Sequence, residues 1–202
     1  MRKIFITGIG TDVGKTVISA ILTEALQADY WKPIQAGDLD NSDSLKIKKW
    51  CSEKVTILPE AFRLTQPLSP HYAAEIDNLT ISKKDLILPI VKGNFILEGA
   101  GGIMVPINQE GLLFVDLIKF WEIPVLLISR HYLGSINHTL LTAEILKNRG
   151  IKVEGIIFVG DENIATEKII LETTKLKSIA RIPIVNEITI EFIKEQAAKI
   201  NI

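Results

Sequence analysis

A lysine and a threonine behind a glycine-rich segment are the residues of this sequence with the clearest chemical potential. The segment from Lys3 to Thr16 reads KIFITGIGTDVGKT: an apolar run leads into glycines, and Gly14-Lys15-Thr16 opens an apolar helical pattern. Backbone N–H groups of such a turn converge on an anion, Lys15 can reach terminal phosphates, and the Thr16 hydroxyl can bind Mg²⁺. The pattern predicts a phosphate-binding loop; the alternative is an ordinary strand-to-helix turn with a chance Gly-Lys-Thr.

The spacing of the glycines indicates a variant of this loop. The strict pattern has a glycine at position 9, where this chain has Ile9. Gly8 instead precedes Gly14 by five intervening residues rather than four. The spacing therefore indicates which kind of phosphate-binding loop to expect.

Two further charged residues follow extended apolar segments. Lys32 ends a short segment that stops at Pro33, and Glu98 ends a buried apolar run before Gly99-Ala100-Gly101-Gly102. In an open parallel sheet, ligands bind beyond the carboxyl ends of the strands, where both side chains would lie. An acid in the position of Glu98 helps to hold Mg²⁺ in P-loop enzymes, whereas the alternative is a sheet-edge glutamate before a flexible turn.

An acidic loop is a third candidate element of the site. Asp38, Asp40 and Asp43 lie close together, and Ser42 or Asn41 can cap a helix that begins at Asp43. One of these carboxylates facing the phosphate site would be a natural Mg²⁺ ligand, although such a loop can also be just a solvated turn. The residue types alone do not choose among the three.

Hydrophobic periodicity gives the elements that must position these residues. It predicts strands at 4–6, 30–32, 55–58, 94–98, 124–129, 153–159 and 178–181, and helices at 17–29, 43–50, 82–91, 135–148, 164–173 and 190–200, with a further helix starting at Pro70. Ser82 and Asp85 fit a capping box for the helix at 82–91. The alternation predicts an α/β fold: one doubly wound, mostly parallel sheet with helices on both faces, of P-loop NTPase type, as a single domain over residues 1–202.

Composition narrows the class of protein. A formal net charge of -1 in 202 residues gives no electrostatic reason to expect nucleic acid or an acidic membrane as partner. The single Cys51 excludes an internal disulfide and suits a reducing compartment. Neither a signal-peptide pattern nor an apolar run long enough for a membrane span is present. A cytoplasmic protein is expected.

Several motifs together resemble the dethiobiotin synthetase family of biotin biosynthesis. They are the loop at 8–16, Lys32-Pro33-Ile34, Ser69-Pro70-His71, Glu98-Gly99-Ala100-Gly101-Gly102 and Leu133-Gly134-Ser135-Ile136-Asn137-His138. The resemblance is collinear from Lys3 to about Pro183. The loop of that family has the form Gly-Thr-Asp-Thr-Xaa-Val-Gly-Lys-Thr, with the same interval between glycines as here.

The resemblance implies an ATP-dependent cyclo-ligase with ATP as co-substrate and Mg²⁺ as cofactor. In that reaction ATP, CO₂ and 7,8-diaminopelargonic acid give dethiobiotin, ADP and phosphate. One amine captures CO₂ as a carbamate, a carbamate oxygen attacks the γ-phosphate, and the second amine closes a cyclic urea from the carbamic-phosphoric mixed anhydride.

The resemblance also implies which residues catalyse the reaction and which bind the metal, the nucleotide and the substrate. Catalytic residues are Lys15 and Lys32, and Mg²⁺ ligands are Thr16, Asp43 and Glu98. Nucleotide-binding residues are Thr11, Asp12, Val13, Gly14, Lys15, Thr16, Asp43, Glu98, Gly99, Gly101 and Gly102. Substrate-binding residues are Thr11, Lys32, Ala36, Gly134, Ser135 and Asn137. The last three would act from a neighbouring subunit, which implies a homodimer with the substrate site at its interface; Ser135 or Asn137 could instead simply cap the helix that follows.

Departures from the family pattern change some expectations. Ile9 and Gly10 replace the usual Thr and Asp, Asp12 replaces a glutamate, and Ala36 replaces a Ser or Thr. Val159 stands where many members have an adenine-reading Asn, so we expect looser discrimination among nucleoside triphosphates. His71 is expected to have a structural role.

Three other functions fit parts of the pattern. A partitioning or cell-division ATPase would carry a second lysine early in the loop, which residues 9–13 lack, and an amidating ligase of corrinoids would need an added glutaminase domain. A nucleotide-binding module without chemistry would bind ATP without substrate-dependent phosphate release. For the ligase, Lys15→Ala and Lys32→Ala are expected to abolish turnover with the fold intact.

Overall fold

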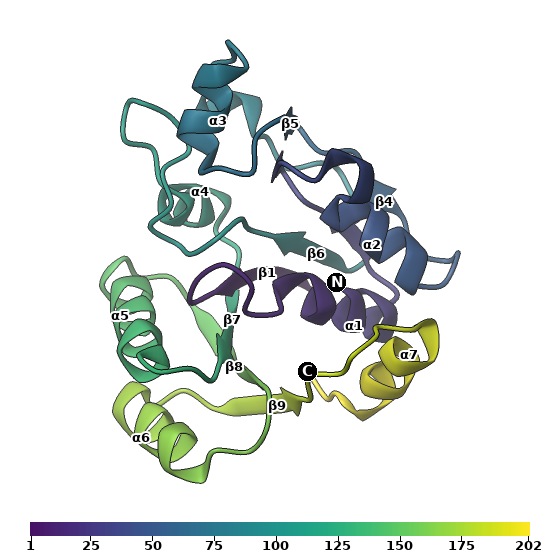
Figure 1. The fold of residues 1–202 in the computed structure, drawn as a ribbon, viewed down its shortest axis with the longest axis vertical. Helices are drawn as coiled ribbons and strands as arrows, with labels where there is room; N and C mark the ends of the chain where they lie inside the picture. The colour runs from purple at the N-terminus through teal and green to yellow at the C-terminus, as the bar shows by residue number, and fades with distance from the viewer.

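A parallel β-sheet forms the centre of the protein, as seen in a computed structural model that describes residues 1–202 (Figure 1). Its seven strands lie in the order β4-β2-β6-β1-β7-β8-β9. Their bounds are β1 (Lys3–Gly8), β2 (Asp29–Trp31), β4 (Ile57–Leu58), β6 (Phe95–Glu98), β7 (Val125–Arg130), β8 (Val153–Val159) and β9 (Ser178–Ile182). The expected mostly parallel sheet is confirmed.

Helices cover both faces of this sheet. They are α1 (Lys15–Leu26), α2 (Asp43–Trp50), α3 (Pro70–Ile76), α4 (Phe114–Trp121), α5 (Ser135–Asn148), α6 (Ile164–Thr174) and α7 (Ile190–Lys199). Figure 1 shows α4 and α5 on one side of the strands and α1 and α7 on the other. None of these helices has both the length and the apolar character that a membrane crossing requires.

Alternation along β1 explains the two buried layers. Ile4 and Ile6 belong to the cluster that packs against α1, whereas Phe5 belongs to the cluster that packs against α4. Successive side chains of a strand point to opposite faces, so an uninterrupted apolar strand fits only between two layers of helices.

The order of the strands brings the candidate residues to one edge. From β1 the sheet continues through β6 and β2 on one side and through β7, β8 and β9 on the other. In a parallel sheet the carboxyl ends of all strands lie at the same end of the sheet. Open α/β sheets bind ligands just beyond these ends, at the point where the strand order reverses. Thr16, Lys32 and Glu98 come together at this position.

The prediction of a helix at 82–91 is wrong. Only Lys83–Asp85 forms a single 3-10 turn, although Ser82 and Asp85 do form the expected capping box. Pro89 lacks an N–H and cannot stand in a helix interior. In addition, the Leu86 carbonyl accepts a hydrogen bond from Trp121 Nε1 at 2.9 Å, so tertiary packing holds this segment in an irregular path.

Two features were not predicted from periodicity. One is α4; the other is a small parallel sheet of β3 (Ile34–Ala36) and β5 (Phe62–Leu64), which lies beyond the end of β2. This small sheet carries the chain from Lys32 toward α2 and so helps to set the position of Asp43.

Candidate functional site

The loop between β1 and α1 has the backbone shape that its glycines permit. Gly14 has a φ of 97°, and a side chain there would meet the methyl groups of Val159 at 3.4 Å. Asp12 also has a positive φ, of 55°, which a non-glycine residue adopts only when its surroundings support it. Lys15 begins α1, and its ammonium donates to the Gly10 carbonyl at 2.7 Å. The amine therefore points back into the loop.

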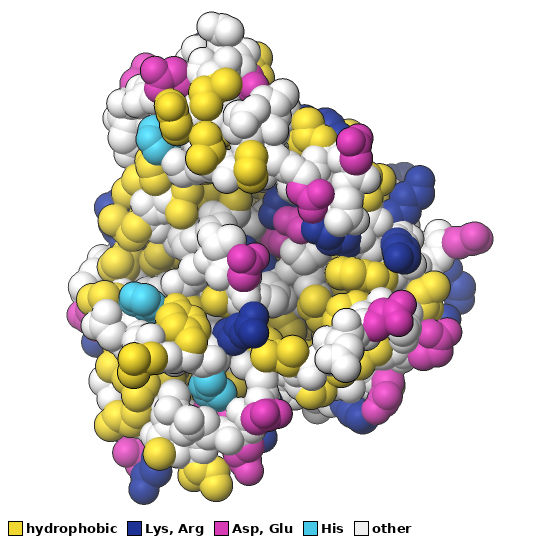
Figure 2. All heavy atoms as spheres, in the orientation of Figure 1, with side chains coloured by type: hydrophobic (Ala, Val, Ile, Leu, Met, Phe, Trp, Pro, Cys, Tyr) yellow, Lys and Arg dark blue, Asp and Glu magenta, His cyan; other side chains and the backbone are white.

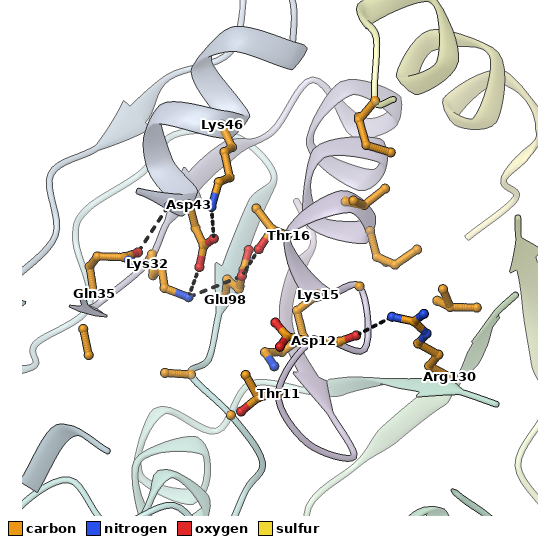
Figure 3. A pocket seen from close by; sticks show the side chains of 18 of the residues that line it. Thr11, Asp12, Lys15, Thr16, Lys32, Gln35, Asp43, Lys46, Glu98 and Arg130 are labelled. Atoms are coloured by element: carbon orange, nitrogen blue, oxygen red, sulfur yellow. Dashed lines mark hydrogen bonds and ion pairs between the residues drawn. The ribbon is translucent and has the colours of Figure 1, made fainter. Parts of the chain in front are cut away.

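Lys32 is buried between two carboxylates. Its Nζ lies 2.6 Å from Asp43 Oδ2 and 3.3 Å from Glu98 Oε1, and it also donates to the Gly99 carbonyl at 3.2 Å (Figure 3). The register of β2 and β6 pairs Trp31 with Leu97, so the next residues, Lys32 and Glu98, come out side by side where the strands end. Parallel pairing thus explains why residues far apart in the sequence form one ion pair.

Thr16 joins this group through its hydroxyl, which donates to Glu98 Oε1 at 2.9 Å. The second Glu98 oxygen accepts from the hydroxyl of Tyr30, at 2.9 Å. Tyr30 was not predicted from the sequence. Its burial, and after that the charge of Glu98, raise the pKa of the Tyr30 hydroxyl well above its ordinary value, so the hydroxyl keeps its proton and remains a donor. Its position two residues before Lys32 in an extended segment was the available signal, because such residues point to the same face.

Asp43 is selected from the acidic loop by its local structure. Ser42 caps α2 by accepting from Leu45 N, and Asp43 N donates to Gln35 Oε1 at 3.2 Å. Gln35, also missed from the sequence, is buried and itself donates to the Gly37 carbonyl. In contrast, Asp38 binds Lys46 at the surface, and Asp40 is exposed. The structure therefore brings only Asp43 of the three to Lys32.

The charged groups of the site shift one another's pKa values. Burial alone would lower the pKa of Lys32, but Glu98 and Asp43 outweigh it and raise that pKa. Burial likewise opposes ionisation of Asp43, and Lys32 overcomes it to lower the Asp43 pKa. For Lys15 the balance differs: burial, assisted by Lys32, lowers its pKa from 10.5 to about 8. Lys15 is a cation without a carboxylate partner of its own.

One cleft of about 880 Å³ contains the loop and the ion pair. Figure 2 shows a hollow on this face, where acidic and basic side chains meet beside hydrophobic ones. Of the residues expected at the site, those that line the cleft are Thr11, Asp12, Gly14, Lys15, Thr16, Lys32, Ala36, Asp43, Glu98 and Gly101. Val13 is buried instead, and Gly99 contributes its carbonyl to Lys32. Gly102 does not line the cleft.

Gly134, Ser135 and Asn137 do not line the cleft of their own chain. Ser135 is buried and its N–H donates to the Tyr132 carbonyl, whereas Asn137 is exposed beside a separate pocket between α5 and α6. His71 pairs through Nδ1 with Ser69 Oγ at 2.8 Å, and of these two residues only Ser69 lines the cleft.

The donor set beside the loop fits a hard divalent cation. The Thr16 hydroxyl contacts Glu98, and Asp43 shares Lys32 with Glu98, so oxygen atoms of three residues converge. Mg²⁺ prefers such oxygen ligands and keeps other positions for phosphate and water. No cluster of three or more His, Cys, Asp or Glu side chains exists that could hold a metal alone. The fit therefore depends on the Thr16 hydroxyl and on a bound phosphate.

The fold and this site define a P-loop NTPase with a variant loop. A family model described as "AAA domain" matches residues 2–191. The chain belongs to the ATP-dependent dethiobiotin synthetase family. A protein of that name, BioD of Christiangramia forsetii, is 54% identical over 182 residues, covering 90% of this chain and 87% of its own. The BioD of Cytophaga hutchinsonii is 48% identical over 202 residues, covering 99% and 97%.

Solved structures with the same fold belong to proteins with other names and activities. A ParA family ATPase from Chlorobium tepidum has a TM-score of 0.59 at 14% identity and covers 98% of this chain and 89% of its own. The cell division ATPase MinD of Pyrococcus furiosus has a TM-score of 0.56 at 18% identity, with coverage of 98% and 91%. At these identities the likeness concerns the fold alone.

Proposed function

We propose that this protein is an ATP-dependent cyclo-ligase that converts 7,8-diaminopelargonic acid and CO₂ to dethiobiotin, with ADP and phosphate as the other products. Family membership at 54% identity supports this reaction. A carbamate formed on one substrate amine attacks the γ-phosphate, and the second amine then closes the ring as phosphate leaves. Residues 1–202 are proposed to act as one ligase domain.

The observation that carries the proposal is the position of Lys32 within a single cleft. Lys15 and Thr16 of the phosphate loop lie on one side of Lys32 (Figure 3). Ala36, Ala100 and the segment from Pro67 to Pro70 also line this cleft and add no charge to it. A triphosphate and an aliphatic diamine can thus lie end to end, with an ammonium at the junction where the carbamate must meet the γ-phosphate.

The residues have distinct roles in this proposal. Lys15 binds the terminal phosphate oxygens, and Lys32 holds the anionic carbamate beside them, because phosphoryl transfer depends on positioning and charge neutralisation. Thr16, Asp43 and Glu98 would hold Mg²⁺, which when bound supplies further positive charge at the phosphate oxygens. Tyr30 keeps the Glu98 carboxylate oriented from behind.

A homodimer is part of the proposal. Gly134, Ser135 and Asn137 lie at the start of α5, outside the cleft of their own chain, and a helix N-terminus offers N–H groups to a carboxylate. A second copy would supply this helix start to the diamine's carboxylate. The enzyme is proposed to work in the cytoplasm, where ATP is available and an unpaired thiol such as that of Cys51 stays reduced.

Phosphate release tests the reaction directly. With ATP and Mg²⁺, release is expected only when both the diamine and bicarbonate are present, because the carbamate is the nucleophile. The measurement is a coupled phosphate assay with each component omitted in turn, with mass-spectrometric detection of dethiobiotin as a second readout. ATP hydrolysis that continues unchanged without the diamine would contradict the ligase and favour a simple ATPase.

Lys15 also gives ATP binding a pH signature. Since its pKa is about 8 in the free protein, roughly half of the Lys15 amines are neutral at pH 8. A bound triphosphate favours the charged form, so binding is expected to take up about half a proton at pH 8 and much less at pH 7. Calorimetry in two buffers of different ionisation enthalpy measures this uptake. Lys15→Met is the control; an equal uptake in that variant would show that another group titrates.

A further inference from the structure

Arg130 is a cation of the cleft that has no carboxylate partner. Among the other basic residues that line the cleft, Lys32 pairs with Asp43 and Glu98, Lys46 pairs with Asp38, and Lys15 donates to the Gly10 carbonyl inside the phosphate loop. Arg130 makes a single hydrogen bond, from NH1 to the carbonyl of Asp12 at 3.0 Å. A guanidinium carries five N–H donors, so most of its binding capacity is directed to no protein group.

The neighbours of Arg130 are apolar and come from adjacent strands. In the register of the sheet Arg130 pairs with Val159 of β8, and Val159 pairs with Ile182 of β9. Beyond them Pro183, Ile184, Val185 and Ile188 line the same part of the cleft. The carboxyl ends of three consecutive strands therefore form an apolar wall with one arginine at its edge.

The two sides of the phosphate loop thus differ in character. The side toward β2 and α2 carries Lys32, Asp43 and Glu98, which suits transferred phosphate and carbamate. The side toward β8 and β9 carries Val159 and the apolar wall, with Arg130 where this wall meets the loop (Figure 3). A nucleoside triphosphate that places its γ-phosphate on the charged side must place its nucleoside on the apolar side.

From this arrangement we propose that Arg130 is a nucleobase-binding residue, which stacks its guanidinium on the flat face of the base while the apolar wall covers the other face. The bond from Arg130 NH1 to the Asp12 carbonyl ties the guanidinium to the loop. Arginine stacks well on aromatic rings because its charge is delocalised and weakly hydrated. This proposal rests on the proposed use of ATP and adds the residue that recognises its base.

The chemistry of stacking determines which bases are accepted. Val159 offers no hydrogen-bond donor or acceptor to a base edge, and every nucleobase has a π-face that a cation can contact. Arg130 therefore selects for a large flat ring rather than for adenine, and ATP and GTP are expected to bind with similar affinity and both more tightly than CTP. This gives a physical basis for the loose discrimination expected from Val159.

The test compares ATP with inorganic tripolyphosphate, which has the phosphates but no base. Replacing Arg130 by alanine is expected to weaken ATP binding about tenfold more than tripolyphosphate binding, within the range known for cation–π contacts. Arg130→Lys keeps the charge without the plane and is expected to bind tripolyphosphate normally and ATP less tightly. Isothermal titration calorimetry with Mg²⁺ measures both ligands.

Other outcomes separate the possible failures. Equal losses for both ligands in Arg130→Ala would overturn the proposal and leave Arg130 as a support of the loop. Unchanged affinities for both ligands would overturn it as well. A wild-type protein that binds neither ligand would instead contradict the proposed ATP-dependent function. Arg149→Ala is a matched control, since Arg149 pairs with Asp116 at the surface, away from the cleft, and should leave both affinities unchanged.

Discussion

Replacement of Lys15 by methionine is expected to abolish dethiobiotin formation and at the same time to make the protein harder to unfold. Activity should fall by at least about 100-fold, because a positive charge at the transferred phosphate is lost. Stability should rise because burial holds the Lys15 pKa at about 8 instead of 10.5. At about 1.4 kcal/mol per pKa unit, the charged amine costs the folded protein up to roughly 3 kcal/mol at pH 7.

The dependence on pH identifies this cause. In the wild-type protein, the charged Lys15 amine lowers the free energy of unfolding by its full amount at pH values well below 8. This cost disappears as pH rises from about 8 toward 10.5, where the lysine of the unfolded chain also loses its proton. The stability advantage of Lys15→Met should therefore shrink over that range. Urea unfolding without nucleotide measures it, with exposed Lys194→Met as the control. A less stable Lys15→Met protein at pH 7 would show that the Lys15 charge contributes to the fold.

Replacement of Lys32 by methionine is expected to remove activity and, in contrast, to destabilise the protein. Glu98 would be left buried, and Asp43 partly buried, without their shared cation, and breaking a buried ion pair costs about 3–5 kcal/mol. From the ion pairs of Lys32 we therefore expect a loss of stability, whereas the sequence alone predicted that a change at Lys32 leaves the fold intact. Denaturant unfolding in the presence of EDTA measures the effect, so that no added metal replaces the lost charge.

A second substitution tests the origin of this loss. In Lys32→Met with Asp43→Asn, one of the two buried charges is gone, so part of the stability should return while activity stays absent. The defect of the single variant should also diminish in acid, because the stability from the Lys32–Asp43 pair is present above pH 3.8 and is lost as pH falls through the lowered Asp43 pKa. A single variant as stable as wild type would contradict the role of Lys32 in the fold.

Lys15 and Lys32 illustrate which properties of the site can be predicted from the sequence and which depend on the folded structure. The sequence predicted a functional role for both: for Lys15 because it follows a glycine-rich loop of phosphate-binding type, and for Lys32 because it stands at the carboxyl end of an extended apolar segment. It also predicted the parallel sheet correctly, since uninterrupted apolar strands need a helix layer on each face. Their opposite effects on stability depend on partners, however: Lys32 has two carboxylates within 3.3 Å, whereas Lys15 contacts the Gly10 carbonyl.

Some contributions to the site exist only in the folded chain. Tyr30, Gln35 and Arg130 carry no motif, and each acts through a residue far away in sequence or on another element: Glu98, Asp43 and Asp12. Likewise, the choice of Asp43 over Asp38 follows from the cap of α2 and from the small β3–β5 sheet, which periodicity did not reveal.

By itself, therefore, the sequence determined the phosphate loop, the alternation of strands and helices, and the family, because these depend on local spacing and residue type. The tertiary structure alone decided which charges neutralise one another, which side of the loop is apolar, and where residues 82–91 run. Those properties depend on strand register and burial, which join residues such as Arg130, Val159 and Ile182 across three strands.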